Sequence, residues 1–135
     1  MNSDRTFNRE DASLLVRLAD QLERGGSDAE IEISDRVSEL ISSAVMLPEG
    51  ERSTEHVELG AVVTYELAGN GEQHTVTIVA PQDADARAAR FSVLTPVGLA
   101  LIGVAVGAES EVILPSGRTQ EIRVLSAHPD FLPAA

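Results

Sequence analysis

Residues 91–108, FSVLTPVGLALIGVAVGA, form an uncharged run in a chain of which 24% is charged. A run of this length raises the question of a membrane-spanning helix. Pro96, Gly98, Gly103 and Gly107 interrupt it, whereas a spanning helix is built mainly from uninterrupted helix-forming residues. We therefore interpret the run as the buried centre of a small soluble α+β domain, and we expect no association with a membrane.

The local pattern divides this run into a strand, a short helix and a turn. Thr95 is placed to cap a helix N-terminus, because its hydroxyl can accept a hydrogen bond from a free backbone N–H group. Pro96 then occupies the first helical position, where its missing N–H group costs nothing. Leu94 and Leu99 have the spacing of a hydrophobic staple, and Gly103 is a suitable helix end.

Charge and composition exclude several classes of function. The chain has no cysteine and no lysine, so thiol nucleophiles, disulfides, cysteine metal sites and lysine-based catalysis are all excluded. The formal net charge of −12 disfavours free nucleic acid as a direct partner, because nucleic-acid binding depends on basic side chains that neutralise phosphates. An acidic surface favours solubility or a basic protein partner. The N-terminal sequence lacks the apolar segment of a signal peptide, and we expect a cytoplasmic protein.

Two amphipathic helices are predicted in the first half of the chain. Leucines recur at three- and four-residue steps between about Arg9 and Arg24, after a possible Asn8 cap. Ser27 and Glu30 have the S-x-x-E spacing of a capping box at the start of a second helix, predicted from about Asp28 to Met46. The very short connection through Gly25-Gly26 predicts an antiparallel helical hairpin, a short coiled coil.

The second half of the chain changes to the alternating pattern of strands. Residues 61–67 and 74–80 are predicted to form a hairpin around Asn70-Gly71, a dipeptide in which both residues can adopt positive φ. A second hairpin is predicted to join residues 111–114 to residues 119–125. The loop 81–89 is predicted to be polar and flexible.

The order of these parts resembles the C-terminal domain of Gre-type transcript-cleavage factors. The resemblance rests on VELG at 57–60, FSVLTPVGLALIG at 91–103 and VGAESEVILPSG at 106–117. It implies an antiparallel β-sheet with one short helix, of the FK506-binding-protein type, and covers residues 57–126. In its helical half, the chain is similar to Gre factors in architecture alone.

The expected domain organisation is therefore a helical hairpin in residues 1–47, a linker in 48–56, a Gre-like C-terminal domain in 57–127 and a loose tail in 128–135. Within the superfamily, the short hairpin is more similar to the regulator of nucleoside diphosphate kinase family, Rnk. Gre factors have a longer coiled coil with an acidic tip motif, D-L-x-E-N-A-x-Y, which is absent here. The resemblance to Rnk implies binding of RNA polymerase near its secondary channel, in competition with other channel-entering factors.

The acids near the tip of the predicted hairpin are Asp28, Glu30 and Glu32. Gre chemistry requires paired carboxylates, because oxygen ligands hold the second Mg²⁺ at the polymerase active site. Here each acid has a structural explanation that needs no metal ion. Glu30 belongs to the capping box, Asp28 interacts favourably with the helix dipole, and Glu32 lies on a solvated face. Arms of fifteen to nineteen residues span only about 22 to 28 Å. We therefore expect polymerase binding without stimulated RNA cleavage, and no metal site.

The resemblance implies a second site in the loop that leads into the C-terminal helix, a polymerase-contact region in Gre factors. The matching residues here are Leu94, Thr95, Pro96 and Val97. Leu94 replaces the acid that usually stands at its position, which removes one polar contact. A helix cap is an equally good interpretation of Thr95 and Pro96, and the two interpretations are compatible.

No catalytic constellation is predicted. His56, His74 and His128 share no ligand-like spacing, and no serine lies in a nucleophile elbow. We therefore expect a monomeric, non-enzymatic transcription regulator without a cofactor. One alternative is a prolyl isomerase, which its fold type would permit, although the few aromatic residues (Phe7, Tyr65, Phe91 and Phe131) cannot build the aromatic wall of such a pocket. The other alternative is a generic interaction module whose helical hairpin dimerises.

Overall fold

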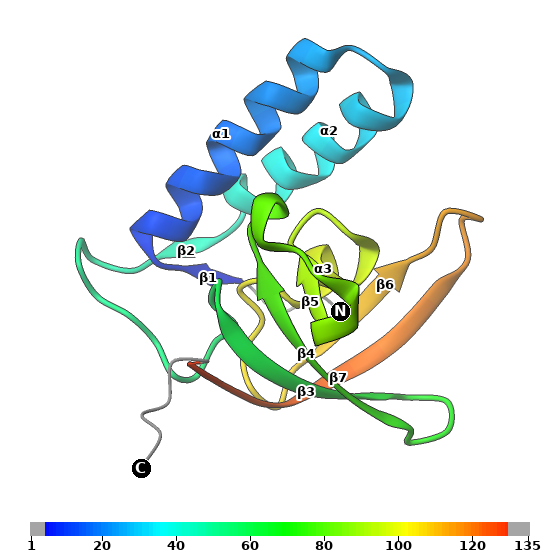
Figure 1. Ribbon diagram of the computed structural model, residues 1–135. Coiled ribbons are helices and arrows are strands. Elements are labelled where there is room, and N and C mark those ends of the chain that lie inside the picture. Colours follow the sequence, from blue (N-terminus) through cyan, green and yellow to red (C-terminus); the bar gives the residue numbers. More distant parts are fainter. Residues whose placement is uncertain (1–4, 130–135) are drawn as a thin grey trace. The chain divides into compact units, whose positions relative to one another are not determined.

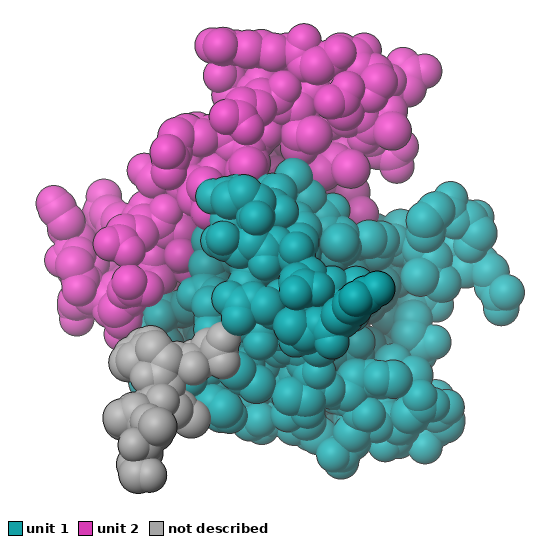
Figure 2. Space-filling view, in the orientation of Figure 1, with its two compact units in different colours: residues 1–3, 53–135 teal, residues 4–52 magenta. Residues whose placement is uncertain are grey.

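The computed structural model describes residues 5–129, and Figure 1 shows the order of its helices and strands. The described chain divides into two compact units, residues 5–52 and residues 53–129, which are coloured separately in Figure 2. Residues 5–52, magenta in Figure 2, form the helical unit with the two predicted helices, and residues 53–129, teal, form the sheet unit with five strands and one short helix. The mixed helix-and-sheet fold class predicted from the sequence is confirmed.

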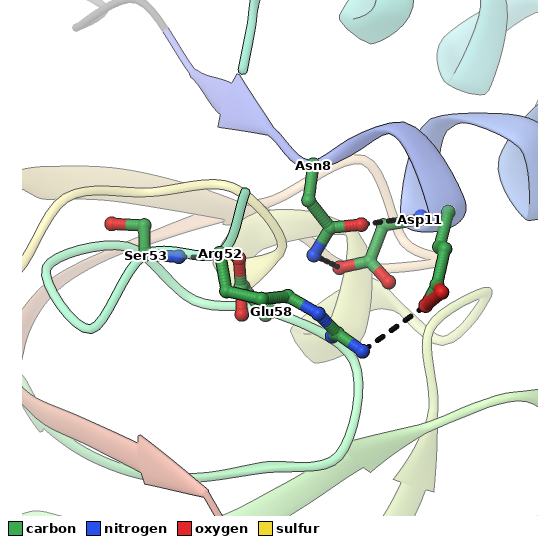
Figure 3. A network of polar contacts seen from close by, with 6 residues as sticks. Asn8, Asp11, Arg52, Ser53 and Glu58 are labelled. Carbon is green, nitrogen blue, oxygen red and sulfur yellow. Dashed lines mark hydrogen bonds and ion pairs between the residues drawn. The ribbon is translucent and has the colours of Figure 1, made fainter. Parts of the chain in front are cut away.

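In the helical unit the strand β1 (Thr6–Phe7) leads into the helix α1 (Arg9–Gly25), and the helix α2 (Asp28–Ser42) leads into the strand β2 (Val45–Met46). Asn8 caps α1 as predicted: its side-chain oxygen accepts a hydrogen bond of 2.7 Å from the Asp11 N–H group. The Asn8 amide also donates to the buried Asp11 carboxylate at 3.2 Å (Figure 3). The N-terminus of α1 is thus fixed by contacts between Asn8 and Asp11, which are three positions apart.

The second helix is shorter than predicted. It ends at Ser42, and Val45–Met46 instead forms a parallel two-residue ladder with Thr6–Phe7. The Val45 N–H group donates to the Arg5 carbonyl at 2.7 Å, and the Leu47 N–H group donates to the Phe7 carbonyl at 2.9 Å. The helical prediction for Val45 and Met46 is wrong because these tertiary hydrogen bonds override the local pattern.

The core of the helical hairpin includes the predicted leucines of α1 only in part. Leu15, Leu18 and Val37 are buried, while Leu22 near the tip is half-buried. Small residues complete the contact, since the Ser34 hydroxyl donates to the Ala19 carbonyl at 2.9 Å inside the interface. The two helices therefore pack closely along their middle and less tightly toward the tip.

The sheet unit has the strand order β5-β4-β3-β7-β6. Its strands are β3 (Ala61–Leu67), β4 (Gln73–Val79), β5 (Arg90–Ser92), β6 (Glu109–Ile113) and β7 (Thr119–Pro129). All neighbouring pairs are antiparallel except β4 and β5, which are parallel. The parallel pair requires the chain to cross back between the strands, and the residues in between do so.

That crossover is more ordered than the flexible loop predicted for residues 81–89. It contains two 3₁₀ turns, η1 (Pro81–Asp83) and η2 (Ala86–Ala88). The Asp85 carboxylate accepts a hydrogen bond from the Arg87 N–H group at 3.1 Å and caps the second turn. Ala89 then adopts a left-handed conformation with φ of 55°. Short-range capping thus replaces the crossover helix that usually links parallel strands.

The hairpin between β3 and β4 forms where predicted, but its turn is different. Only Gly71 has positive φ, whereas Asn70 instead accepts a hydrogen bond from the Glu72 N–H group at 2.8 Å. The turn is therefore longer than the two-residue type that Asn-Gly favours. The second hairpin, between β6 and β7, turns through Leu114–Arg118, with Gly117 at φ of 88°.

The uncharged run supplies the core of this unit. It forms the end of β5, the helix α3 (Pro96–Leu101) and the turn that follows. Val93, Leu99, Leu101 and Ile102 are at most 1% exposed, and they are joined in the core by Val63, Ile78, Ile122 and Val124. Within residues 5–129, no helix is both long and apolar enough to cross a membrane.

The strand β7 extends further than the predicted domain boundary. It includes His128 and Pro129, which pair with Val62 and Ala61 of β3. These two residues therefore belong to the sheet and not to a loose tail. The rest of the predicted tail, residues 130–135, lies outside the described residues.

Candidate functional site

The segment Leu94–Val97 connects β5 to α3, and a dense set of hydrogen bonds fixes its conformation. The Thr95 hydroxyl accepts from the Gly98 N–H group at 3.1 Å, which confirms the predicted cap. The same hydroxyl donates to the Ser92 carbonyl at 2.7 Å. The Ser92 hydroxyl in turn accepts from the Leu94 N–H group at 3.1 Å. The segment is therefore held rigidly at both ends.

Close backbone packing adds to this rigidity. A Cβ atom on Gly98 would lie 2.7 Å from the Val93 Cα atom and would also collide with the Ser92 carbonyl oxygen. The first turn of α3 is consequently pressed against the end of β5, and only glycine fits between them. The sequence indicates Gly98 only as an interruption of the uncharged run and gives no sign of its contact with Ser92, because close approach between backbone segments leaves no local pattern.

The four predicted contact residues, Leu94, Thr95, Pro96 and Val97, are all half-buried. They lie next to one another on one turn, and each presents part of its side chain to solvent. Their arrangement is a preformed, mainly apolar surface with one hydroxyl that is already engaged in capping. A surface of this type can contact a protein partner without first paying the entropy of ordering a loop.

The tip of the helical hairpin consists of Gly26 in a left-handed conformation followed by the Ser27 cap. The capping box is complete: the Ser27 hydroxyl accepts from the Glu30 N–H group at 3.1 Å, and the Glu30 carboxylate accepts from the Ser27 N–H group at 3.3 Å. Glu30 therefore faces back toward its own helix terminus, as the sequence predicts.

The other two tip acids, Asp28 in the first turn of α2 and Glu32 just after it, are exposed. Across residues 5–129 no group of three or more histidine, aspartate or glutamate side chains is placed to hold a metal ion. The tip acids and the Leu94–Val97 segment belong to different units. They are two separate candidate contact surfaces.

His56 and His74 have separate local roles. The His56 Nδ1 atom lies 2.8 Å from the Ser53 hydroxyl, which also accepts from the Glu55 N–H group at 3.1 Å. The His74 ring stacks on Tyr65 with 5.6 Å between ring centroids, and its Nε2 atom lies 3.0 Å from the Glu72 carboxylate. Burial raises the pKa of Tyr65. These contacts stabilise a turn and a hairpin end.

A further polar group lies near the N-terminus of α1. The Arg52 guanidinium forms an ion pair of 3.0 Å with the Glu10 carboxylate, drawn as a dashed line in Figure 3. The Arg9 side chain donates to the Leu47 carbonyl at 3.1 Å. Both contacts join the start of α1 to the segment after β2, so they fasten the base of the helical hairpin.

Comparison with known proteins places these features in context. Residues 52–129 match the family described as "Transcription elongation factor, GreA/GreB, C-term". The chain is 37% identical to transcription elongation factor GreA of Thermotoga maritima over 92 residues, which cover 67% of this chain and 58% of that protein. It is 36% identical to transcription inhibitor protein Gfh1 of Thermus thermophilus over 96 residues, 70% of this chain and 60% of that protein.

A solved structure shows the same fold. The transcription elongation factor GreA/GreB of Nitrosomonas europaea superposes with a TM-score of 0.66 at 24% sequence identity, covering 92% of this chain and 98% of that chain. By sequence, the matches to the first curated relatives cover 50% to 58% of those proteins.

Proposed function

Because the chain belongs to the GreA/GreB C-terminal family of transcription elongation factors, we propose that it binds RNA polymerase near the secondary channel. In this proposal it competes there with Gre-type factors and does not stimulate transcript cleavage. It acts as a monomer in the cytoplasm, has no catalytic activity and is of the Rnk type.

The observation that carries the proposal is the construction of the hairpin tip. With 17 and 15 residues, α1 and α2 are about 26 and 22 Å long. At their tip, the Glu30 carboxylate is engaged in the capping box, so Asp28 and Glu32 are the remaining carboxylates among the first five residues of α2. A short hairpin that has lost one of its tip carboxylates to capping is poorly suited to hold a second metal ion in a deep active centre.

The Leu94–Val97 segment is the proposed contact with the polymerase. Its support is the rigid turn described above, together with its place inside the family match at residues 52–129. Because the capping hydroxyl of Thr95 is already satisfied, we assign the contact itself to the apolar surfaces of Leu94, Pro96 and Val97.

Competition binding tests the proposal directly. Purified core RNA polymerase is expected to retain this protein, and an added Gre factor is expected to displace it. A transcript-cleavage assay on stalled elongation complexes is expected to show no stimulation by this protein and inhibition of Gre-stimulated cleavage. Strong stimulation of cleavage would contradict the assignment, and retention unaffected by the Gre factor would place binding elsewhere on the polymerase.

A matched pair of variants tests the contact surface. Val97 lies at the second position of α3, where an acid interacts favourably with the helix dipole, so Val97→Asp is expected to fold. It is expected to weaken polymerase binding about tenfold, because it places a charge in an apolar contact. Val106→Asp, at a valine that is 39% exposed in the same unit, is the control and is expected to bind normally. Equal affinities for the two variants would refute the assignment.

A further inference from the structure

The strand β6 lies at one edge of the five-stranded sheet and carries an unusual charge pattern. In its pairing with β7, Glu109 lies opposite Arg123 and Glu111 lies opposite Glu121. All four side chains are exposed, while Val112 and Ile122 between them are buried. The four charged residues therefore share the outer face of the sheet.

Hydrogen bonding shows which way the backbone of β6 points. The Leu114 N–H group donates to the Arg118 carbonyl, and the Val124 N–H group donates to the Ala108 carbonyl. Hydrogen-bonded and non-hydrogen-bonded pairs alternate in an antiparallel ladder, so the pairs of Glu109, Glu111 and Ile113 are non-hydrogen-bonded. The backbone N–H and C=O groups of these three residues consequently point away from β7, toward the outer edge.

Non-hydrogen-bonded pairs also bring side chains closest together. Glu111 and Glu121 are thus two like charges at the shortest cross-strand spacing, an arrangement that destabilises a sheet. No cation among the described residues pairs with either carboxylate. Arg123 forms its ion pair with Glu109 at 2.9 Å and lies opposite Glu66 on its other side. On β3, β6 and β7 the outer face therefore carries four carboxylates, of Glu66, Glu109, Glu111 and Glu121, and the one guanidinium of Arg123.

An apolar surface continues this edge. Ile113 and Leu114, where β6 enters its turn, are each 40% exposed. The edge has Glu109 and Glu111 on its outer face and the buried Val112 on its other face, so it fits an extended segment in which basic and apolar residues alternate. A second copy of this chain fits poorly, because pairing β6 with β6 would set glutamates against glutamates.

We propose that the edge of β6 binds an extended, arginine- or lysine-rich segment of a partner protein by strand addition. The partner's backbone pairs with the outward groups of Glu109, Glu111 and Ile113. Its basic side chains lie on the outer face beside Glu111 and Glu121, whose mutual repulsion they relieve. This inference is independent of the Leu94–Val97 contact proposed above.

The probe is an octapeptide of alternating arginine and valine, titrated calorimetrically into the full-length protein. In antiparallel strand addition, residues opposite Glu109 and Glu111 form hydrogen-bonded pairs with them. The arginines of the peptide occupy these positions, and their backbone N–H groups donate to the backbone carbonyl groups of Glu109 and Glu111. Methylation of the arginine backbone nitrogens is therefore expected to abolish binding, whereas methylation of the valine nitrogens is expected to preserve it.

Two charge-reversal variants complete the test. Glu111→Lys replaces an attraction by a repulsion and is expected to weaken peptide binding about tenfold at low salt. Asp83→Lys makes the same change in charge beside β5, at the opposite edge of the sheet, and is expected to change affinity less than about twofold. Equal losses in the two variants, or tight binding of the arginine-methylated peptide, would show nonspecific charge attraction and overturn the proposal. Absence of saturable binding up to millimolar peptide would overturn it as well.

Discussion

Replacement of Gly98 by alanine is expected to destabilise the sheet unit, although a helix-propensity argument predicts the opposite sign. Gly98 lies inside α3, where alanine is favoured over glycine by about 1 kcal/mol. The added Cβ atom, however, would lie 2.7 Å from the Val93 Cα atom and 2.8 Å from the Val93 carbonyl carbon. Both neighbours are backbone atoms, so no side-chain rotation relieves the contact.

The magnitude follows from these two opposing effects. Ordinary carbon–carbon contacts are about 3.5 to 4.0 Å, so α3 must move away from β5 by about 1 Å. Such overpacking costs about 3 kcal/mol at the upper end of its usual range. After the gain in helix propensity, the net loss in free energy of unfolding is about 2 kcal/mol. For a cooperative unit of this size, that loss corresponds to a Tm lower by about 10 °C.

Urea and thermal unfolding followed by circular dichroism measure this loss. Gly69→Ala is the matched control, because a Cβ atom there meets nothing within 4 Å and its backbone does not require positive φ. The control is expected to change the free energy of unfolding by less than about 0.5 kcal/mol. If Gly98→Ala were as stable as Gly69→Ala, or more stable than the parent protein, the inference that α3 packs too closely on β5 to accept a Cβ atom at position 98 would be refuted.

Three further predictions concern the cap, the charge pair and the buried phenol. Ser27→Ala removes the capping box and is expected to lower the free energy of unfolding by about 1 kcal/mol in urea titrations, whereas Ser38→Ala at an exposed position of the same helix is expected to change it little; equal effects would contradict the capping role. Glu111→Gln is expected to raise stability by a few tenths of a kcal/mol at low salt, and a gain that persists unchanged in 1 M NaCl would argue against relief of charge repulsion. Because burial raises the pKa of Tyr65, its contribution to stability is present below its unfolded pKa of about 10 and is lost as pH rises beyond it. Tyr65→Phe is therefore expected to reduce the loss of stability between pH 9 and pH 11, and an unaltered pH profile would refute this assignment.

Much of the candidate site could be predicted from the sequence where the determining interactions are local. The Ser27 and Thr95 hydroxyls each accept from an N–H group three positions later, of Glu30 and Gly98, so the local sequence predicts both caps. The start of α3 and the positions of the two hairpins follow for the same reason. The contact role of Leu94–Val97, in contrast, comes from family resemblance and stays a prediction.

The tertiary structure decided features that join distant residues. Ser42 ends α2 because Val45–Met46 pairs with Thr6–Phe7, almost forty residues earlier. The parallel pairing of β4 with β5, the close approach at Gly98 and the opposition of Glu111 to Glu121 likewise depend on register across the sheet. Local sequence patterns encode caps and turns because their partners are adjacent, whereas register and backbone contact are fixed only when the whole unit packs.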